Sequence, residues 1–250
     1  MIRRRLTSSP FSTVKLFSAR KPRAAKRGGR DAFHTGENFA PRIARFVLTS
    51  AMLRPVPVAD PAAEIAAWWR LVELCLPSHE TCGALTFAPS GTETLEREWE
   101  HWVADTFLPV LHPALLSLQN TAAAQDSVRL LSEDAALGAA LTADAAQRSL
   151  LSGRHLLLAF QPPQGAKFLE RLHETALHRT EVGQLATIFA VRGQVFHLPF
   201  VQVAGALVLA ECVLGADAAG VTLPAARTID LMQKAMDSVA AVPSIQLLAV

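Results

Sequence analysis

The residues of this chain that could carry covalent chemistry are few, and they gather around Cys75 and Cys82. His79 lies between these two cysteines, and an imidazole beside a thiol can remove its proton to make a nucleophile. The sequence names no third residue to orient His79 and no oxyanion element. The cysteines also lack the CxxC spacing of a redox pair or a zinc ribbon. We therefore interpret them as independent thiols.

Carboxylates and histidines are the next candidates. Four glutamates lie between residues 93 and 100, but acidic side chains near a helix start are favoured by the helix dipole, which predicts a solvated face. His173 and His178 are five residues apart and would diverge by roughly 140° on a helix, so they do not share a metal ion. The chain also contains no GxSxG or HExxH motif. We expect no catalytic residue, no metal and no cofactor, and we lean against an enzyme.

The composition favours an all-α fold. Half of the 250 residues are hydrophobic and 18% are charged, which excludes global disorder, and no hairpin pattern is visible. Asp60 and Pro61 predict a helix start, and this helix should end near Leu76. Ser90 and Glu93 form a capping-box pattern ahead of the next helix. The prolines at 109 and 113 should kink or end that helix.

The sequence predicts six to eight helices in all, and two of the later ones have distinctive patterns. A long amphipathic helix should run from Phe168 to about Phe189. The segment 198–215 is apolar on nearly all faces, which predicts a central helix surrounded by protein. Its uninterrupted apolar run is shorter than the roughly 20 residues of a bilayer span, so we predict no transmembrane helix.

Charge divides the chain. Residues 1–30 hold ten Lys and Arg and no acid, whereas residues 31–250 hold 14 basic and 22 acidic residues. The Arg- and Ser-rich, acid-free segment predicts a mitochondrial leader, and the protein should then lie in the matrix or on the matrix face of the inner membrane. Residues 31–58 are expected to be an extended arm, followed by a helical domain over 59–250. A contact between the basic cluster and RNA is the alternative use of the N-terminus.

Three stretches together resemble the C-terminal helical domain of glutathione S-transferase-like proteins, and are similar to the membrane-associated prostaglandin E synthase type 2 family. The resemblance covers about residues 90–240 and implies a helical bundle with a buried central helix. The stretches are 94–113, 168–176 and 193–215. The matching residues are Trp99, Trp102, Asp105, Pro113, Glu170, Leu172, Glu174 and Gly205.

Two features depart from that family. The cap of the family's buried helix falls at His197 and Phe200, where His197 is at best a weak cap and Phe200 cannot accept the reciprocal bond. The family also binds glutathione in a thioredoxin-like domain, but no Cys-Pro-x-Cys motif is present and that domain is apparently missing. The resemblance therefore implies a pseudoenzyme.

The sequence thus predicts a non-catalytic interaction or scaffold protein, a subunit or assembly element of a larger mitochondrial complex with protein partners. Trp68 and Trp69 point about 100° apart on one predicted helix, so one of them is the expected partner contact. The alternative is a divergent glutathione-dependent transferase or isomerase, which would need a glutathione site within residues 31–90.

Overall fold

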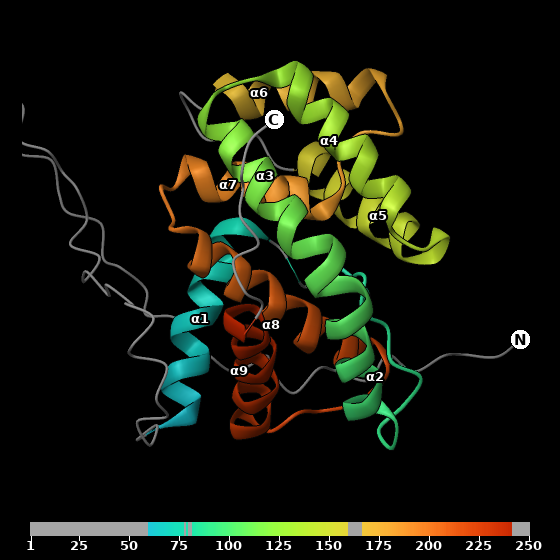
Figure 1. Ribbon diagram of the computed structural model, residues 1–250, viewed down its shortest axis with the longest axis vertical. Helices are drawn as coiled ribbons and strands as arrows, with labels where there is room; N and C mark the ends of the chain where they lie inside the picture. Colours follow the sequence, from blue (N-terminus) through green and yellow to red (C-terminus); the bar gives the residue numbers. More distant parts are fainter. Residues whose placement is uncertain (1–59, 78, 80–81, 160–166, 242–250) are drawn as a thin grey trace, which may run out of the picture. The chain divides into compact units, whose positions relative to one another are not determined.

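The computed structural model describes residues 60–77, 79, 82–159 and 167–241 (Figure 1). The predicted leader and arm lie outside these residues. The described part of the chain is helical and contains no strand, which confirms the all-α prediction. The helices are α1 (Pro61–Cys75), α2 (Leu95–Trp102), the π-helix η3 (Val103–Leu111), α3 (His112–Ala123), α4 (Ser127–Ala140), α5 (Ala143–Ala159), α6 (Lys167–His178), α7 (Leu185–Val195), α8 (Phe200–Ala218) and α9 (Ala225–Ala241).

The first helix forms as its sequence predicts. The backbone N–H of Ala62 donates to the Asp60 carboxylate over 3.0 Å, which satisfies one of the free N–H groups at the helix start. Pro61 occupies the first turn, where no backbone donor is needed. The helix ends at Cys75, two residues before Pro77.

The predicted capping box at Ser90 is wrong. The Ser90 N–H donates to the carboxylate of Glu98 over 2.7 Å, while Glu93 is exposed and α2 begins only at Leu95. Residues 92–94 form a turn, which moves the helix start by about one turn along the chain. The acceptor for Ser90 is therefore a glutamate eight residues later and not the one predicted.

The prolines do not end the helix that follows. Pro109 lies inside η3, and Pro113 lies in the first turn of α3. The wider π pattern is visible where the His112 N–H donates to the Phe107 carbonyl, five residues back. Pro109 has no N–H to donate, so a regular α-helix would lose one backbone hydrogen bond at this residue. In η3 the backbone hydrogen bonds span five residues instead of four, and the chain stays helical through the proline.

The long helix predicted from Phe168 to Phe189 is also wrong. The structure has two helices there, α6 and α7, separated by residues 179–184. Gly183 adopts a φ of 113°, which favours glycine. The Asp134 carboxylate of α4 accepts from the N–H groups of Gly183 and Gln184 at 2.9 and 2.8 Å, so a tertiary contact starts α7.

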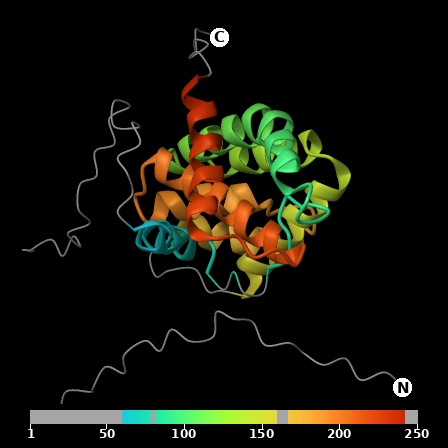
Figure 2. The same ribbon diagram turned by 90° about the horizontal axis from the view of Figure 1, so that it is seen from below.

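Helix α8 is buried over most of its length and packs against α1, α9, α7 and α3 (Figure 1 and Figure 2). It begins at Phe200 with Pro199 as its N-cap and no side-chain cap, so His197, with a φ of 54°, does not cap it. The helix is long and apolar enough to cross a membrane, but 72% of its 18-residue apolar segment is buried inside the fold. Its apolarity is accounted for by packing within the fold.

Candidate functional site

The residues that carry the family resemblance divide between core and surface. Trp99 and Trp102 are buried and stacked at 4.8 Å, and the Trp99 indole N–H donates to the Leu231 carbonyl over 3.1 Å. Leu172 is buried in α6. The remaining members are Asp105, Pro113, Glu170 and Glu174, which are exposed, and Gly205, which is buried in α8.

Both candidate partner residues are half-buried on α1. The Trp68 ring lies directly against Gly205 of α8, where an added Cβ would come within 2.6 Å of Trp68 Cζ3. Trp69 meets the His79 ring edge-on, with the ring centroids 4.7 Å apart. Trp68 is therefore an internal packing residue on at least one face, and the partner contact of either residue stays a prediction.

The predicted thiols are free and not poised for chemistry. Burial raises the pKa of both Cys75 and Cys212 to about 12, and it also raises the pKa of the half-buried Cys82. The Cys82 N–H bonds the His79 carbonyl, while the His79 ring packs on Trp69. Among the described residues no group of three or more His, Cys, Asp or Glu could hold a metal ion.

A buried segment between α1 and α2 forms the first notable polar site. Leu85, Thr86 and Phe87, which we call the strap, are exposed by only 0%, 6% and 2%. Arg148 of α5 donates from Nε to the Leu85 carbonyl over 2.7 Å and from Nη2 to the Thr86 carbonyl over 3.1 Å. The Thr86 hydroxyl also accepts from the Trp102 indole N–H over 3.0 Å. The strap is therefore fastened to α5 and α2 by polar bonds.

Glu211 of α8 fastens the strap from the other side. Its side chain is fully buried, Oε1 accepts from the Thr86 hydroxyl and Oε2 accepts from the Phe87 N–H, each over 2.8 Å. Burial raises the pKa of Glu211 to about 7, against the lowering effect of these donors and of the Arg148 charge. The carboxyl group therefore takes up a proton near neutral pH.

Sequence reasoning noted Glu211 only as a member of the apolar segment. The sequence nevertheless marks Glu211 as unusual, because it is the one charged residue between Leu198 and Val213, in a segment that is otherwise composed of residues typical of a hydrophobic core. A charge in such a position needs buried partners. Those partners lie 124 and 125 residues away, in a loop without a recognisable pattern, so the sequence could not identify them.

Asp134 is the second buried carboxylate, with 1% exposure. Burial raises its pKa, while the bonds from the N–H groups of Gly183 and Gln184 lower it. The Leu185 N–H bonds the Ser149 hydroxyl of α5 over 3.0 Å, so α4 and α5 together satisfy the start of α7. Both buried carboxylates thus bind backbone N–H groups of this chain.

The exposed apolar side chains lie mainly on one part of the fold. The large exposed hydrophobic residues of the described chain are Val128, Leu151, Leu158, Leu177 and Val201, and all but Val201 lie on α4, α5 and α6. These three helices contact one another and occupy the upper part of Figure 1. We call the four side chains on them the α4–α6 face.

Helix geometry brings part of this face together. Leu151 and Leu158 are seven residues apart on α5, which places them within about 20° on the same side of the helix. The Arg154 guanidinium donates to the Arg179 carbonyl over 2.6 Å, so the end of α6 that carries Leu177 lies beside the middle of α5. Leu177 is 58% exposed and Leu151 is 63% exposed.

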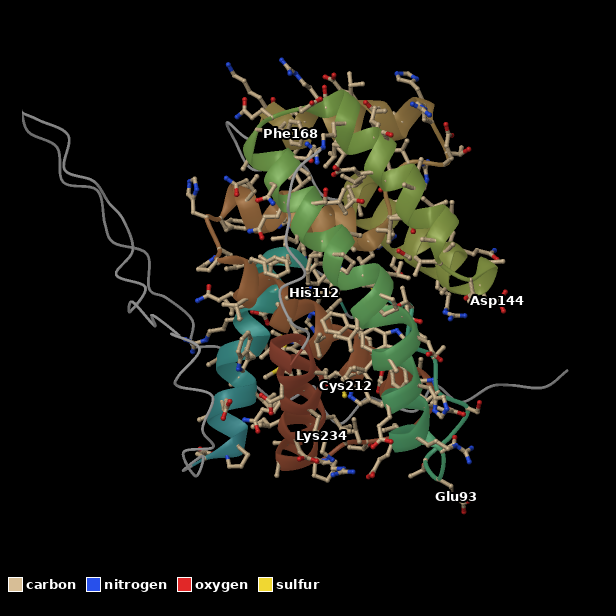
Figure 3. All side chains as sticks on the ribbon, viewed as in Figure 1. Glu93, His112, Asp144, Phe168, Cys212 and Lys234 are labelled. Atoms are coloured by element: carbon tan, nitrogen blue, oxygen red, sulfur yellow. The ribbon has the colours of Figure 1, made fainter. Side chains whose placement is uncertain are left out.

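A small cavity opens between α4 and α6. It measures about 240 Å³, with Leu130, Phe168 and Leu172 among its apolar lining and Ser127 and Arg171 among its polar lining. Figure 3 shows Phe168 at this end of the helices, away from Cys212 of α8. The cavity is thus separate from the strap and from the core helix.

In comparisons with known proteins, no family model, no curated protein and no solved structure matches the chain.

Proposed function

We propose that this protein is a non-catalytic interaction protein, which acts as a subunit or assembly element of a larger complex. The α4–α6 face carries this proposal. Isolated apolar side chains are common on protein surfaces, but four of the five large exposed hydrophobic residues of the described chain lie on three helices that contact one another, which favours a contact surface on this part of the fold. The partner is a protein that offers apolar side chains to Leu151, Leu158 and Leu177.

The buried polar groups support a structural role. Catalytic carboxylates are usually presented to a cleft, where a substrate can reach them. Glu211 and Asp134 are exposed by 0% and 1%, and their bonds go to the strap and to the start of α7. These two groups therefore maintain the fold and are not accessible to a substrate.

The mitochondrial location and the finer fold assignment belong to the same proposal. The basic, acid-free segment 1–30 supports import into mitochondria. The spacing of Trp99, Trp102 and Leu172 supports a glutathione S-transferase C-terminal-like bundle, and their burial agrees with a role in a core.

The alternative of a glutathione-dependent enzyme is less favoured. A thioredoxin-like unit would need strands within residues 31–90. The described part of residues 60–90 consists of α1 and a connection without strands that contains the strap. The position expected for a cis-proline, Pro57, lies outside the described residues.

The test is the native size of the full-length protein in a gentle mitochondrial extract, measured by native electrophoresis with mass spectrometry of co-migrating proteins. We expect the wild type in a large assembly and the Leu151→Glu/Leu158→Glu variant at a smaller size. Val201→Glu is the control, because it also places a carboxylate at an exposed apolar residue, but outside the α4–α6 face.

Helical circular dichroism must be the same for the three proteins, so that a lost assembly is not confused with lost folding. Migration of the folded wild type as a free monomer or dimer would sink the proposal. An equal loss of assembly in the Val201→Glu protein would show that the α4–α6 face is not the contact surface.

A further inference from the structure

The bond between Glu211 and the strap has an unusual charge environment. Both carboxylate oxygens are used by the strap, and the side chain has no exposure. None of the ion pairs in the described part of the chain includes Glu211. Arg148, the charged residue that acts on it, is bound to the carbonyls of Leu85 and Thr86. A negative charge on Glu211 is therefore compensated by hydrogen bonds without a direct counter-ion.

We propose that Glu211 and the strap form a pH-dependent latch, which holds the strap against α8 in mildly acidic solution and releases it more readily as the pH rises from 6 to 8. This regulation is independent of the proposed function, because it concerns α8 and the strap and not the α4–α6 face.

The two protonation states explain the direction. A protonated carboxyl keeps both contacts, since one oxygen accepts from the Phe87 N–H and the other can donate to the Thr86 hydroxyl oxygen. It also removes the cost of a buried charge. When the strap leaves, water reaches Glu211 and the ionised form is solvated. Opening is therefore coupled to loss of a proton.

The size of the effect follows from the two pKa values of the carboxyl group. In the closed state burial raises the pKa to about 7, whereas the hydrated group returns to its ordinary value of 4.5. The linkage between these values predicts that the ratio of open to closed strap rises about tenfold between pH 6 and pH 8. Above pH 8 the ratio becomes constant, because both states are ionised.

The other groups around the latch do not produce this dependence. Trp102 faces the strap from α2 and has no titratable group, and Arg148 faces it from α5 with its guanidinium bound to the carbonyls of Leu85 and Thr86. The buried thiols of α1 and α8, Cys75 and Cys212, stay neutral because burial raises the pKa of each to about 12. Glu211 is therefore the group whose charge changes at the latch.

Release of the strap would expose apolar surface. The Phe87 ring packs edge-on against Trp99 at 5.0 Å and lies over Gly215, where an added Cβ would come within 2.6 Å of the ring. The strap also lies on the connection between α1 and α2. Opening therefore uncovers the tryptophan pair and loosens the link to α1.

The experiment is amide hydrogen exchange of the Phe87 N–H, measured by NMR on the full-length protein at pH 6, 7 and 8 and corrected for the intrinsic exchange rate. We expect the protection factor of Phe87 to fall about tenfold from pH 6 to pH 8. In Glu211→Gln the amide oxygen can accept from Phe87 and the amide nitrogen can donate to Thr86. Protection in this variant should be independent of pH.

Two controls make the result decisive. Glu98→Gln removes a carboxylate that accepts from the Ser90 N–H near the strap, and it should leave the tenfold dependence unchanged. Leu209, in the buried middle of α8, reports global unfolding. A constant protection factor in the wild type, a retained dependence in Glu211→Gln, or protection of Phe87 equal to that of Leu209 would each overturn the latch.

Discussion

Gly205 of α8 lies against the indole ring of Trp68 of α1, so closely that a Cβ at residue 205 would come within 2.6 Å of Cζ3. The two residues are far apart in the sequence. Because Gly205 has no side chain, the large indole ring of Trp68 can pack directly on the backbone of α8. This contact fixes α1 on the central helix. It also separates the roles of the two neighbouring tryptophans, because Trp69 packs on His79 instead.

Trp68→Ala and Trp69→Ala should therefore differ. Loss of the Trp68 ring leaves a void beside Gly205, and we expect it to lower the free energy of unfolding by about 2–3 kcal/mol, less than a fully buried tryptophan would cost. Trp69→Ala should have the smaller effect on stability and the larger effect on assembly. Urea denaturation and native electrophoresis measure the two quantities. If both variants simply unfold, neither tryptophan is a docking residue.

Gly215→Ala should destabilise the protein although alanine is the better helix former. The added Cβ would lie 2.7 Å from the Phe87 carbonyl oxygen, which is backbone and cannot rotate away. We expect a loss of about 2 kcal/mol in the free energy of unfolding, since overpacking exceeds the gain of about 1 kcal/mol in helix propensity. Gly91→Ala is the control, because nothing lies within 4 Å of its added Cβ. Equal urea midpoints for the two variants would contradict the close approach.

The difference in stability between Glu211→Gln and the wild type should depend on pH. The folded-state pKa of Glu211 is raised to about 7 from 4.5, so the folded state holds a proton that the unfolded state has released between these values. Its contribution to stability is therefore full below pH 4.5 and is lost as pH rises to about 7, by about 3 kcal/mol. Urea titrations should show that the free energy of unfolding of Glu211→Gln increases relative to that of the wild type between pH 5 and pH 8. An unchanged difference would mean that Glu211 stays ionised when folded.

Asp134→Ala should weaken the start of α7. It leaves the N–H groups of Gly183 and Gln184 buried without their acceptor, which we expect to cost about 2–3 kcal/mol. Asp134→Asn keeps one acceptor oxygen and should lose less. The control is Asp126→Ala, which removes an exposed cap from α4 and should cost about 1 kcal/mol or less. Thermal unfolding followed by circular dichroism ranks the three, and an equal loss at residues 126 and 134 would show that burial of the acceptor is unimportant.

The sequence was informative where a short segment contains its own determinants. Asp60 and Pro61 start α1 as predicted, because the Asp60 carboxylate and the Ala62 N–H that donates to it are two residues apart. The burial of α8 was also predictable, since a helix with apolar side chains on every face must be covered. Such features depend on local bonding and on composition, and both can be read without a partner segment.

The sequence was misleading where a distant residue competes with a local pattern. Ser90 bonds Glu98 instead of forming a box with Glu93, and the predicted helix through residue 178 is interrupted because Asp134 binds Gly183 and Gln184 from another helix. Likewise, nothing near Glu211 in the chain indicates that it receives both of its hydrogen bonds from Thr86 and Phe87. The amino-acid sequence alone determined the helical class, the first helix and the buried helix. Only the tertiary structure decided the breaks between helices and the state of the buried carboxylates, because those depend on hydrogen bonds between residues that are distant in sequence and shielded from water.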